Sequence, residues 1–544
     1  MLGLMQDWPL LCHRIIDHAA IQHPDRPVVT RSVEGPMHTT NYAEIRRRAL
    51  KVAQRLERDG VRLGDRVATL GWNTWRHIEC WYGILGIGAI YHTVNPRLFP
   101  DQIAWIVNHA EDRVMMVDLT FVPLLEQLAD RLPTVERYIV LTDAAHMPAT
   151  TLKNAVAYED WIGEADGDFA WKSFDENTAA GMCYTSGTTG NPKGVLYSHR
   201  SNVLHAFMAS LPDAKGISAR DVVLPVVPLF HANCWSLAFS TPLTGASLVL
   251  PGAKLDGPSI YELLDTYKVT FTAGVPTVWL MLLDHLEKIG GKLPHLKRIV
   301  IGGSASPRAM TQAFQDKYGV EVIHAWGMTE MSPLGSLCTL KPEYAALTGD
   351  AKLDIQMKQG HPPFGVEMKI TDDHGKPLPW DGKTFGRLKV RGPAVARRYF
   401  KDDTEILDDE GFFDTGDVAT MDSHGYMQIT DRSKDVIKSG GEWISSIDLE
   451  NLAVGRPKVA EAAVIGVQHP KWDERPLLII VLKKDQKASK DEILNFMQGK
   501  IAKWWMPDDV AFVDEIPHTA TGKIQKTALR DRFKDYRLPT AAVA

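Results

Sequence analysis

The segment from Tyr184 to Gly194, YTSGTTGNPKG, constrains what this chain can fold into more than any other stretch. Its three glycines let backbone N–H groups approach an anion, its four Ser/Thr hydroxyls add donors, and its lysine adds positive charge. An apolar run at 180–184 predicts a buried strand before it, and 194–199 leads towards a helix near Ser201. We therefore predict a phosphate-binding loop between a strand and a helix.

Two other interpretations of this loop fit less well. A Walker A motif needs a Gly-Lys pair, whereas Pro192 precedes Lys193 here. A flexible Ser/Gly linker would need neither of these residues, nor a buried strand beside it. The phosphate-binding interpretation is the one that accounts for the whole segment.

Size and composition place the chain among globular proteins of more than one domain. Its 544 residues are too many for one compact core, and 44% hydrophobic and 24% charged residues are ordinary values. A net charge of -6 gives no electrostatic reason to expect binding to nucleic acid or to an anionic membrane.

Cysteine usage and the N-terminus predict a cytoplasmic protein. The five cysteines are scattered without a C-x-x-C pair, which argues against a disulfide framework or a zinc site. The first seven residues lack the basic region of a signal peptide. No apolar stretch reaches the roughly 18–20 residues of a transmembrane helix, so we expect no membrane span.

The order of predicted elements indicates an α/β fold with doubly wound parallel sheets. Strands such as 65–70 and 89–94 alternate with helices such as 42–59 and 75–87. The helix at 42–59 carries a cluster of basic residues that we expect to be a solvated face rather than a nucleic-acid site. The cluster comprises Arg46, Arg47, Arg48 and Arg55.

Changes in composition suggest the domain boundaries. We expect a large N-terminal domain at 1–430, whose glycine-rich part at about 360–430 forms a β-rich subdomain. The polar segment 431–435 is expected to be a hinge. Residues 436–544 are then a small, mobile α+β domain, with a helix expected at 490–504.

The phosphate loop resembles that of the adenylate-forming superfamily, which includes acyl-CoA synthetases, luciferases and peptide-synthetase adenylation domains. The family motif, [YF]-T-S-G-[ST]-T-G-x-P-K-G, matches at every position, and the resemblance extends over essentially the whole chain. It implies ATP, CoA and a small carboxylic acid as substrates, with Mg²⁺ as cofactor. In the loop it implies nucleotide binding by Thr185, Ser186, Gly187, Thr188, Thr189 and Lys193.

A second motif bears on the metal and the nucleoside. The segment WGMTE, from Trp326 through Gly327, Met328 and Thr329 to Glu330, resembles the family's [YW]-G-x-T-E. In the family this glutamate and the first threonine of the phosphate loop, here Thr185, hold magnesium. Trp326 could stack on adenine. Gly302 and Gly303 follow a strand and would let a flat base or an acyl group approach the backbone.

Further motifs resemble those for the ribose and the acyl group. Asp417 occupies the place of the aspartate that takes both ribose hydroxyls, and Arg432 that of the arginine contacting ribose and phosphate. The segment PLFHANCW places His231 and Trp235 at the acyl site. Lys438 and, more weakly, Lys526 are further nucleotide-binding candidates.

The resemblance also assigns roles near the C-terminus. Lys523, in PHTATGK, matches the adenylation lysine, and Lys434 occupies the hinge about which the small domain rotates between two reactions. The run KSGGEWIS resembles fatty acyl-CoA synthetases, whose tryptophan, here Trp443, gates the acyl channel. The expected CoA-binding residues are Ser439, Gly440, Gly441, Glu442, Trp443 and Glu474.

These expectations define an AMP-forming acid–CoA ligase. Within the family the chain is most similar to ligases that activate 3-methylmercaptopropionate, and next to fatty acyl-CoA synthetases. A medium- or long-chain fatty acyl-CoA synthetase is therefore one alternative, and a non-catalytic protein that binds acyl-adenylates is another. The motifs alone also fit luciferase chemistry, although nothing in the sequence calls for oxygen. Fatty-acid relatives suggest a homodimer.

Overall fold

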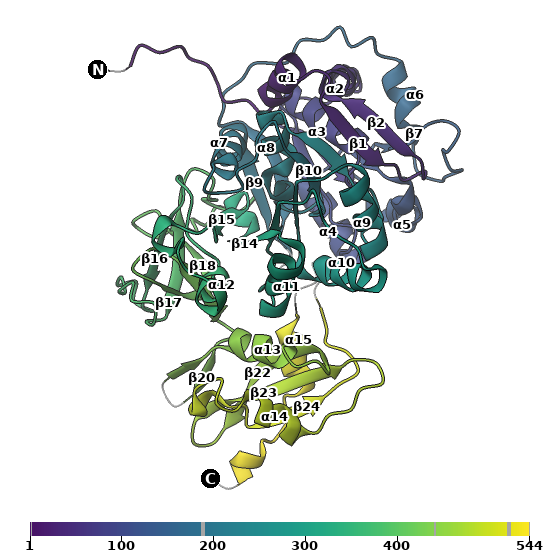
Figure 1. Cartoon of the computed structure of the whole chain (residues 1–544). Helices are drawn as coiled ribbons and strands as arrows, with labels where there is room; N and C mark the ends of the chain where they lie inside the picture. Colours follow the sequence, from purple (N-terminus) through teal and green to yellow (C-terminus); the bar gives the residue numbers. More distant parts are fainter. Residues whose placement is uncertain (2, 186–190, 440–441, 519–523, 543–544) are drawn as a thin grey trace.

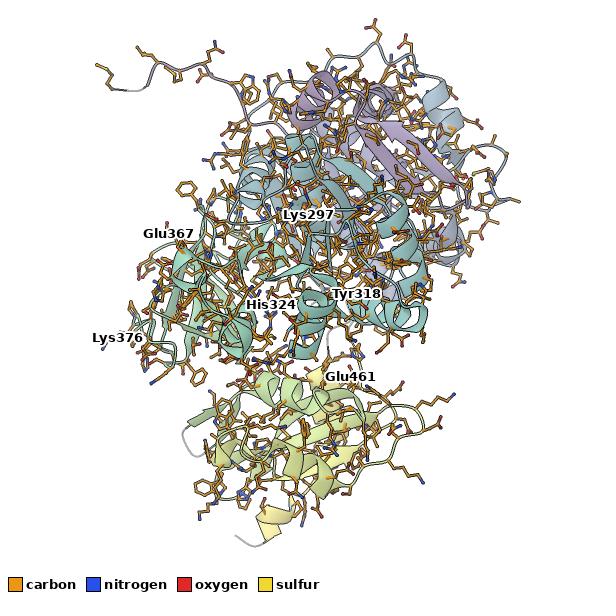
Figure 2. All side chains as sticks on the ribbon, in the orientation of Figure 1. Lys297, Tyr318, His324, Glu367, Lys376 and Glu461 are labelled. Carbon is orange, nitrogen blue, oxygen red and sulfur yellow. The ribbon has the colours of Figure 1, made fainter. Side chains whose placement is uncertain are left out.

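The computed structural model describes residues 1, 3–185, 191–439, 442–518 and 524–542, with only the backbone of 442, 443 and 542 (Figure 1). Within these ranges the chain forms four sheets flanked by helices. The predicted α/β class is confirmed: two large, mainly parallel sheets come first, then a small antiparallel sheet, then a separate C-terminal sheet. Figure 2 shows the side chains on this framework, with His324 in the large domain and Glu461 in the C-terminal part.

The first large sheet carries the phosphate loop at one edge. Its order is β7-β6-β5-β3-β4-β8-β9, parallel throughout except for the last pair. The strands are β3 (Arg66–Leu70), β4 (Ile90–Thr93), β5 (Val114–Val117), β6 (Arg137–Val140), β7 (Val156–Ala157), β8 (Ala179–Tyr184) and β9 (Gly194–Ser198).

The second large sheet has parallel strands in its interior and an antiparallel strand at each edge. Its order is β15-β14-β13-β12-β10-β11-β1-β2. The strands are β1 (Pro27–Arg31), β2 (Met37–Asn41), β10 (Val222–Pro225), β11 (Ser247–Leu250), β12 (Phe271–Gly274), β13 (Arg298–Ile301), β14 (Glu321–Gly327) and β15 (Leu334–Leu337).

Helices form three layers around these two sheets. The main apolar core joins residues of both sheets to one set of helices, so that this set lies between the sheets: α1 (His13–Gln22), α2 (Tyr42–Arg58), α3 (Trp75–Gly86), α7 (His199–Ser210) and α8 (Leu237–Thr244). A second core packs α4 (Pro100–Ala110) and α5 (Val122–Leu128) on the outside of the first sheet. A third packs α9 (Gly257–Thr266), α10 (Pro276–Ile289) and α11 (Arg308–Tyr318) on the outside of the second. The shorter α6 (Tyr158–Gly163) and α12 (Gly349–Gln356) complete the large domain.

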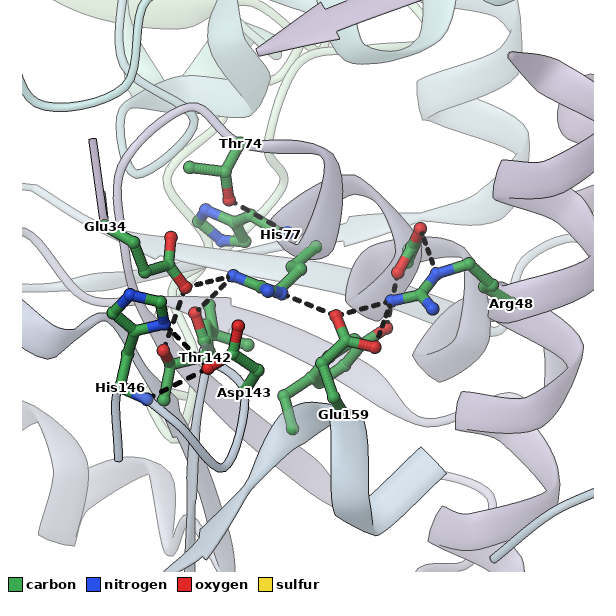
Figure 3. Close-up of polar contacts among 12 residues, drawn as sticks. Glu34, Arg48, Thr74, His77, Thr142, Asp143, His146 and Glu159 are labelled. Atoms are coloured by element: carbon green, nitrogen blue, oxygen red, sulfur yellow. Dashed lines mark hydrogen bonds and ion pairs between the residues drawn. The ribbon is translucent and has the colours of Figure 1, made fainter. Parts of the chain in front are cut away.

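The expectation of a solvated arginine face on α2 is wrong for part of the cluster. Arg47 is 52% exposed, but the Arg48 side chain is only 16% exposed and its Nε lies 2.8 Å from Oε1 of the fully buried Glu79. Glu159 links Arg48 to Arg76, which also pairs with Glu34 (Figure 3). The reason is that α3 is buried along its whole length, so its charged side chains need partners: Glu79 finds Arg48 on α2, and Arg76 finds Glu34 and Glu159.

The small antiparallel sheet and the C-terminal unit follow. The first consists of β16 (Glu367–Thr371), β17 (Gly386–Arg391), β18 (Phe413–Met421) and β19 (Met427–Arg432). The C-terminal sheet consists of β20 (Ile437–Ser439), β21 (Glu442–Ile444), β22 (Val459–His469), β23 (Asp473–Leu482) and β24 (Asp509–Phe512). Apolar clusters pack α13 (Ser446–Val454) and α14 (Lys490–Met497) on one face of this sheet and α15 (Lys526–Arg532) on the other.

One helix prediction in the C-terminal unit is wrong at its end. The helix expected at 490–504 stops at Met497, and a short 3₁₀ turn, Lys503–Trp505, follows separately. Gln498 is already extended, with ψ of 132°, and Gly499 then adopts a positive φ of 78°, so neither residue continues a right-handed helix. The apolar residues beyond it continue the helical spacing without continuing the helix.

Candidate active site

The phosphate loop connects two antiparallel strands, which corrects the strand-to-helix prediction. Strand β9 pairs with β8 in register Tyr184↔Gly194, and α7 begins only at His199, after the N-cap Ser198. At the base of the loop, the Thr185 N–H donates to the Lys193 carbonyl at 2.9 Å, and the Lys193 N–H donates to Thr185 Oγ1 at 3.3 Å. Strand pairing, rather than a helix N-terminus, therefore holds the two ends of the loop together. Ser186, Gly187, Thr188 and Thr189 lie outside the described residues.

Tyr399 connects the loop lysine to the expected magnesium ligand. Its hydroxyl donates to Glu330 Oε1 at 2.9 Å, and the Lys193 Nζ lies 4.7 Å from the centroid of its ring. Burial raises the pKa of the Tyr399 phenol and the neighbouring Glu330 raises it further, so the hydroxyl stays protonated as a donor. One connected cluster thus includes Thr185 and Lys193 of the loop together with Glu330, which lies about 140 positions later in the chain.

The tyrosine in this cluster was missed by sequence reasoning. Tyr399 stands in the segment ARRYF, between the β17 and β18 strands, and no spacing within that segment marks it. The backbone explains its position, because the Ala396 N–H donates to the Glu330 carbonyl at 2.7 Å and the Phe400 N–H donates to the Gly194 carbonyl at 2.8 Å. These bonds place the segment 396–400 between the WGMTE segment and the phosphate loop.

The donor set in this cluster suits magnesium. Glu330 is only 7% exposed, and its carboxylate together with the Thr185 hydroxyl offers oxygen ligands. Mg²⁺ is usually held by one or two carboxylates plus water and substrate phosphates. Among the described residues there is no group of three or more His, Cys, Asp and Glu side chains that could cage a metal ion. The residues therefore fit an ion that arrives with a nucleotide.

The expected nucleoside residues Trp326, Asp417 and Arg432 meet in one place. The Trp326 Nε1–H donates to Asp417 Oδ2 at 2.9 Å, and the Arg432 Nε lies 2.8 Å from Asp417 Oδ1. Asp417 and Arg432 face each other across β18 and β19. The Asp417 side chain is 4% exposed, and these two neighbours hold its carboxylate in place. The three residues come from two different sheets, which brings the small antiparallel sheet up to the end of β14.

Close backbone approach fixes the indole of Trp326. A Cβ placed on Gly335 would lie 2.3 Å from the Trp326 ring, so glycine is required on the neighbouring strand β15. Gly327, Met328 and Thr329 follow in the turn that leads to Glu330, where the Met328 N–H donates to the Pro333 carbonyl and the Thr329 carbonyl accepts from the Tyr197 hydroxyl.

Two of the expected acyl residues, Gly302 and Trp235, lie against each other. A Cβ on Gly302 would lie 3.1 Å from the Trp235 ring and 3.0 Å from the Ala325 carbonyl oxygen, so this glycine and the indole are in direct contact. Gly303 has a positive φ of 83° and continues the turn after β13. His231 is half-buried and immediately precedes the 3₁₀ turn η3 (Ala232–Ser236), which carries Trp235.

The C-terminal unit brings together a second group of predicted residues. The Lys438 N–H donates to Glu474 Oε2 at 3.1 Å, and Ser439 accepts from Arg475 at 3.4 Å. Lys434 lies in a turn between β19 and β20, closed by the Asp435 N–H and the Arg432 carbonyl. Gly440, Gly441 and Lys523 lie outside the described residues, and of Glu442 and Trp443 only the backbone, in β21, is described.

Lys526 is buried against partners of its own. Its Nζ lies 2.7 Å from Glu450 Oε1 and also contacts the Ser446 hydroxyl. Glu450 raises the pKa of the Lys526 ammonium against the opposing effect of burial, so the lysine is charged. In this arrangement Lys526 stabilises α13 and α15 and does not reach out of the small domain.

Two parts of the chain match families of known proteins. Residues 16–400 match the AMP-binding enzyme family, and residues 448–523 match the AMP-binding enzyme C-terminal domain. The chain belongs to the AMP-binding enzyme family. The predicted resemblance is confirmed, and so is the predicted class of enzyme, an AMP-forming acid–CoA ligase.

Individual relatives cover nearly the whole chain. The sequence is 50% identical to 3-methylmercaptopropionyl-CoA ligase of Ruegeria lacuscaerulensis, over 98% of this chain and 99% of that protein. It is 45% identical to a medium-chain-fatty-acid–CoA ligase of Ectopseudomonas oleovorans, over 100% of this chain and 99% of that one. Among solved structures, the anthranilate CoA ligase AuaEII in complex with anthranoyl-AMP has a TM-score of 0.86 at 27% identity, covering 99% of this chain and 100% of that one.

Proposed function

We propose that this ligase activates a short carboxylic acid, with 3-methylmercaptopropionate as the best substrate, and transfers it to CoA. The observation that carries the proposal is the contact of the Trp235 indole with Gly302, which directly follows β13, the strand that pairs with β14. An indole packed on this backbone would close the acyl pocket at a short length. The 50% identical relative named for the same acid supports the choice.

The reaction has two balanced steps. A carboxylate oxygen of the acid attacks the α-phosphorus of ATP, the bond to the β,γ-phosphates breaks, and pyrophosphate leaves. The CoA thiol then loses its proton and attacks the acyl carbon, and AMP leaves with the electron pair of the broken C–O bond. Neither step needs a nucleophile from the protein, so its contribution is positioning and charge stabilisation.

Each cluster then has an assigned role. Lys193 and the loop residues hold the phosphates, Asp417 and Arg432 hold the ribose, and Trp326 borders the base. Lys523 would bridge the carboxylate and phosphate oxygens during adenylation. Glu330 and Thr185 would hold Mg²⁺, which neutralises phosphate charge when bound with the nucleotide. Tyr399 orients the Glu330 carboxylate for that task.

The small domain is proposed to contribute to both steps. The division into 1–430, a hinge at 431–435 and 436–544 stays a proposal, as does rotation about Lys434. After rotation the CoA channel would be bordered by Ser439, Gly440, Gly441, Glu442, Trp443 and Glu474, with Trp443 as a gate for the acyl group. The hydrogen bond from the Lys438 N–H to the Glu474 carboxylate links β20 to β23.

We further infer a cytoplasmic homodimer formed through the large domain. None of the helices in the described ranges has the length and apolar character needed to cross a membrane. Light scattering on the purified chain tests the dimer directly: a monomer mass at micromolar concentration would contradict it.

The acid preference is tested by kcat/KM for butyrate, 3-methylmercaptopropionate, hexanoate, octanoate and dodecanoate. An open tunnel would gain up to about 0.8 kcal/mol per added methylene, whereas overpacking a closed pocket costs about 1–3 kcal/mol. A thioether sulfur against aromatic edges gains roughly 0.3–1.5 kcal/mol. We expect a maximum at 3-methylmercaptopropionate; a steady rise to dodecanoate would favour the medium- or long-chain alternative. No pyrophosphate release with any acid would favour a non-catalytic binding protein.

A further inference from the structure

A lysine outside the sequence motifs is buried behind the acyl pocket. Lys215, in the loop after α7, is 1% exposed, and its Nζ donates to the carbonyl oxygen of Trp235. Burial lowers the pKa of this ammonium to about 7. A lysine is rarely buried to this degree without a carboxylate partner, and the acceptor that the structure gives Lys215 is a backbone carbonyl. The position is therefore unusual for a lysine that serves only to fill space.

The carbonyl it binds belongs to a left-handed turn. Five consecutive residues, none of them glycine, have positive φ: Ala232 at 38°, Asn233 at 58°, Cys234 at 55°, Trp235 at 48° and Ser236 at 70°. Such a run is unfavourable for L-residues and persists only where surrounding contacts over-determine it. The turn also directs Trp235 towards Gly302, because a right-handed turn at the same place would aim the side chain differently.

Contacts with three other segments of the chain hold the turn. The Tyr91 hydroxyl donates to Asn233 Oδ1 at 2.6 Å, and Cys234 Sγ donates to the Val227 carbonyl at 3.1 Å. Lys215 supplies the third contact, at the residue that carries the indole. His205 also lies beside this ammonium, and both burial and the Lys215 charge lower the pKa of its imidazole, to about 3. Its Nε2 accepts from the Leu334 N–H at 3.0 Å, so it is a neutral neighbour.

We propose that Lys215 is a positioning residue for acyl selection: by holding the Trp235 carbonyl, it keeps the indole on Gly302 and so sets the length of acid that the pocket accepts. This inference rests on the proposed function, since it presupposes that the pocket beside Gly302 takes the acyl group. Lys215 is buried against the Trp235 carbonyl and would act on the acid only through that residue. Without the lysine, the buried Trp235 carbonyl loses its donor and the strained turn can relax.

The test is the ratio of kcat/KM for octanoate to that for 3-methylmercaptopropionate. Both values come from the same sample, so the ratio does not depend on the fraction of protein that is folded. Lys215→Met keeps an unbranched apolar stem, one bond shorter than lysine, but removes the donor, and should raise the ratio tenfold or more, mainly through a lower KM for octanoate. Lys288→Met is the matched control, because Lys288 is an exposed lysine of α10 paired with Asp284, and it should leave the ratio unchanged.

Two further variants make the result decisive. Trp235→Phe should raise the ratio as well, and the double variant should raise it by much less than the product of the two single effects, because both act on one indole. Lys215→Gln is also one bond shorter than lysine but keeps an N–H donor, so it should raise the ratio less than Lys215→Met and serves if the methionine variant does not fold. A wild-type ratio in a folded Lys215 variant, or fully multiplicative effects, would overturn the proposal. Wild-type protein inactive with every acid would instead overturn the proposed function.

Discussion

At the scale of single residues, the site depends on side chains that bridge motifs. Tyr399 joins Lys193 to Glu330, and Asp417 joins Trp326 to Arg432. Each bridge fixes a charged group before any ligand arrives, which reduces the reorganisation needed when phosphate charge enters the site. Tyr399, to which we assign no contact with substrate, can therefore influence how well Glu330 binds its metal.

Tyr399→Phe tests the first bridge. The ring under Lys193 remains, while Glu330 loses a hydrogen bond of the charged type, worth roughly 1.5–3 kcal/mol. We expect pyrophosphate exchange to fall about 10- to 100-fold at low Mg²⁺ and to recover partly at high Mg²⁺. Tyr318→Phe, on α11 and packed against Phe314, is the control. An unchanged Mg²⁺ dependence in Tyr399→Phe would mean that the hydroxyl does not orient the metal carboxylate.

Lys523→Ala should abolish adenylation while sparing thioester formation from supplied acyl-adenylate. Loss of a contact to developing charge is worth about 3–4 kcal/mol, or 10²–10³-fold. Lys526→Met is the informative contrast, because it leaves the buried Glu450 unpaired and should lower the unfolding temperature instead. The two half-reactions are measured separately; an equal loss in both for Lys523→Ala would contradict its assignment.

At the scale of elements, short connections decide what can move. The turn between β19 and β20 is closed by the Asp435 N–H and the Arg432 carbonyl, and it is anchored on both sides: Ser433 bonds the Gly416 carbonyl, and Asp435 pairs with Arg530. Any rotation of the C-terminal unit must therefore change the dihedral angles of the few residues between these anchors.

Lys434→Pro should uncouple the two steps. Proline fixes φ at its own position and restricts Ser433 before it, which stiffens the turn. Adenylate should form at close to the normal rate, while single-turnover transfer to CoA slows at least tenfold. Lys434→Ala removes the same ammonium but leaves the backbone free, so it should transfer normally. If both variants transfer at the wild-type rate, the pivot lies elsewhere.

At the scale of the whole molecule, buried neutral histidines link stability to pH. Burial is the largest cause that lowers their pKa in the folded state, to about 4 for His13, His77 and His324 and to about 3 for His199 and His205. The unfolded chain binds protons on these groups below about pH 6.5, whereas the folded chain does not until pH 4 or lower. The stability that these neutral histidines contribute is therefore fully present above about pH 6.5, and it is lost as the pH falls towards 4.

The unfolding temperature should accordingly drop steeply between pH 6.5 and 4. Each such histidine contributes a slope of up to about 1.4 kcal/mol per pH unit in that window. Calorimetry across the window measures the drop, and His77→Gln should make it shallower. His374→Asn, at an exposed position, should not. A flat profile over the same range would show that these imidazoles do not govern acid stability.

Much of the site could be predicted because its signals are local. Gly187, Pro192 and Lys193 stand within one segment, and the WGMTE run places a carboxylate directly after a turn. The alternation of strands and helices likewise predicts the parallel sheets from nearest-neighbour patterns. The class of enzyme followed from the resemblance of such segments to those of a known family.

What the tertiary structure alone decided is which distant residues meet. Sheet register sets Asp417 opposite Arg432, and chain packing brings Tyr399 to Glu330 and Lys215 to Trp235. The same applies to Arg48, whose place on a charged helix face gave no sign of the buried Glu79 that it meets. A local pattern specifies the shape of an element and its apolar face, but the partner of a buried charge depends on which element packs against it. That choice is made by the free energy of the whole core.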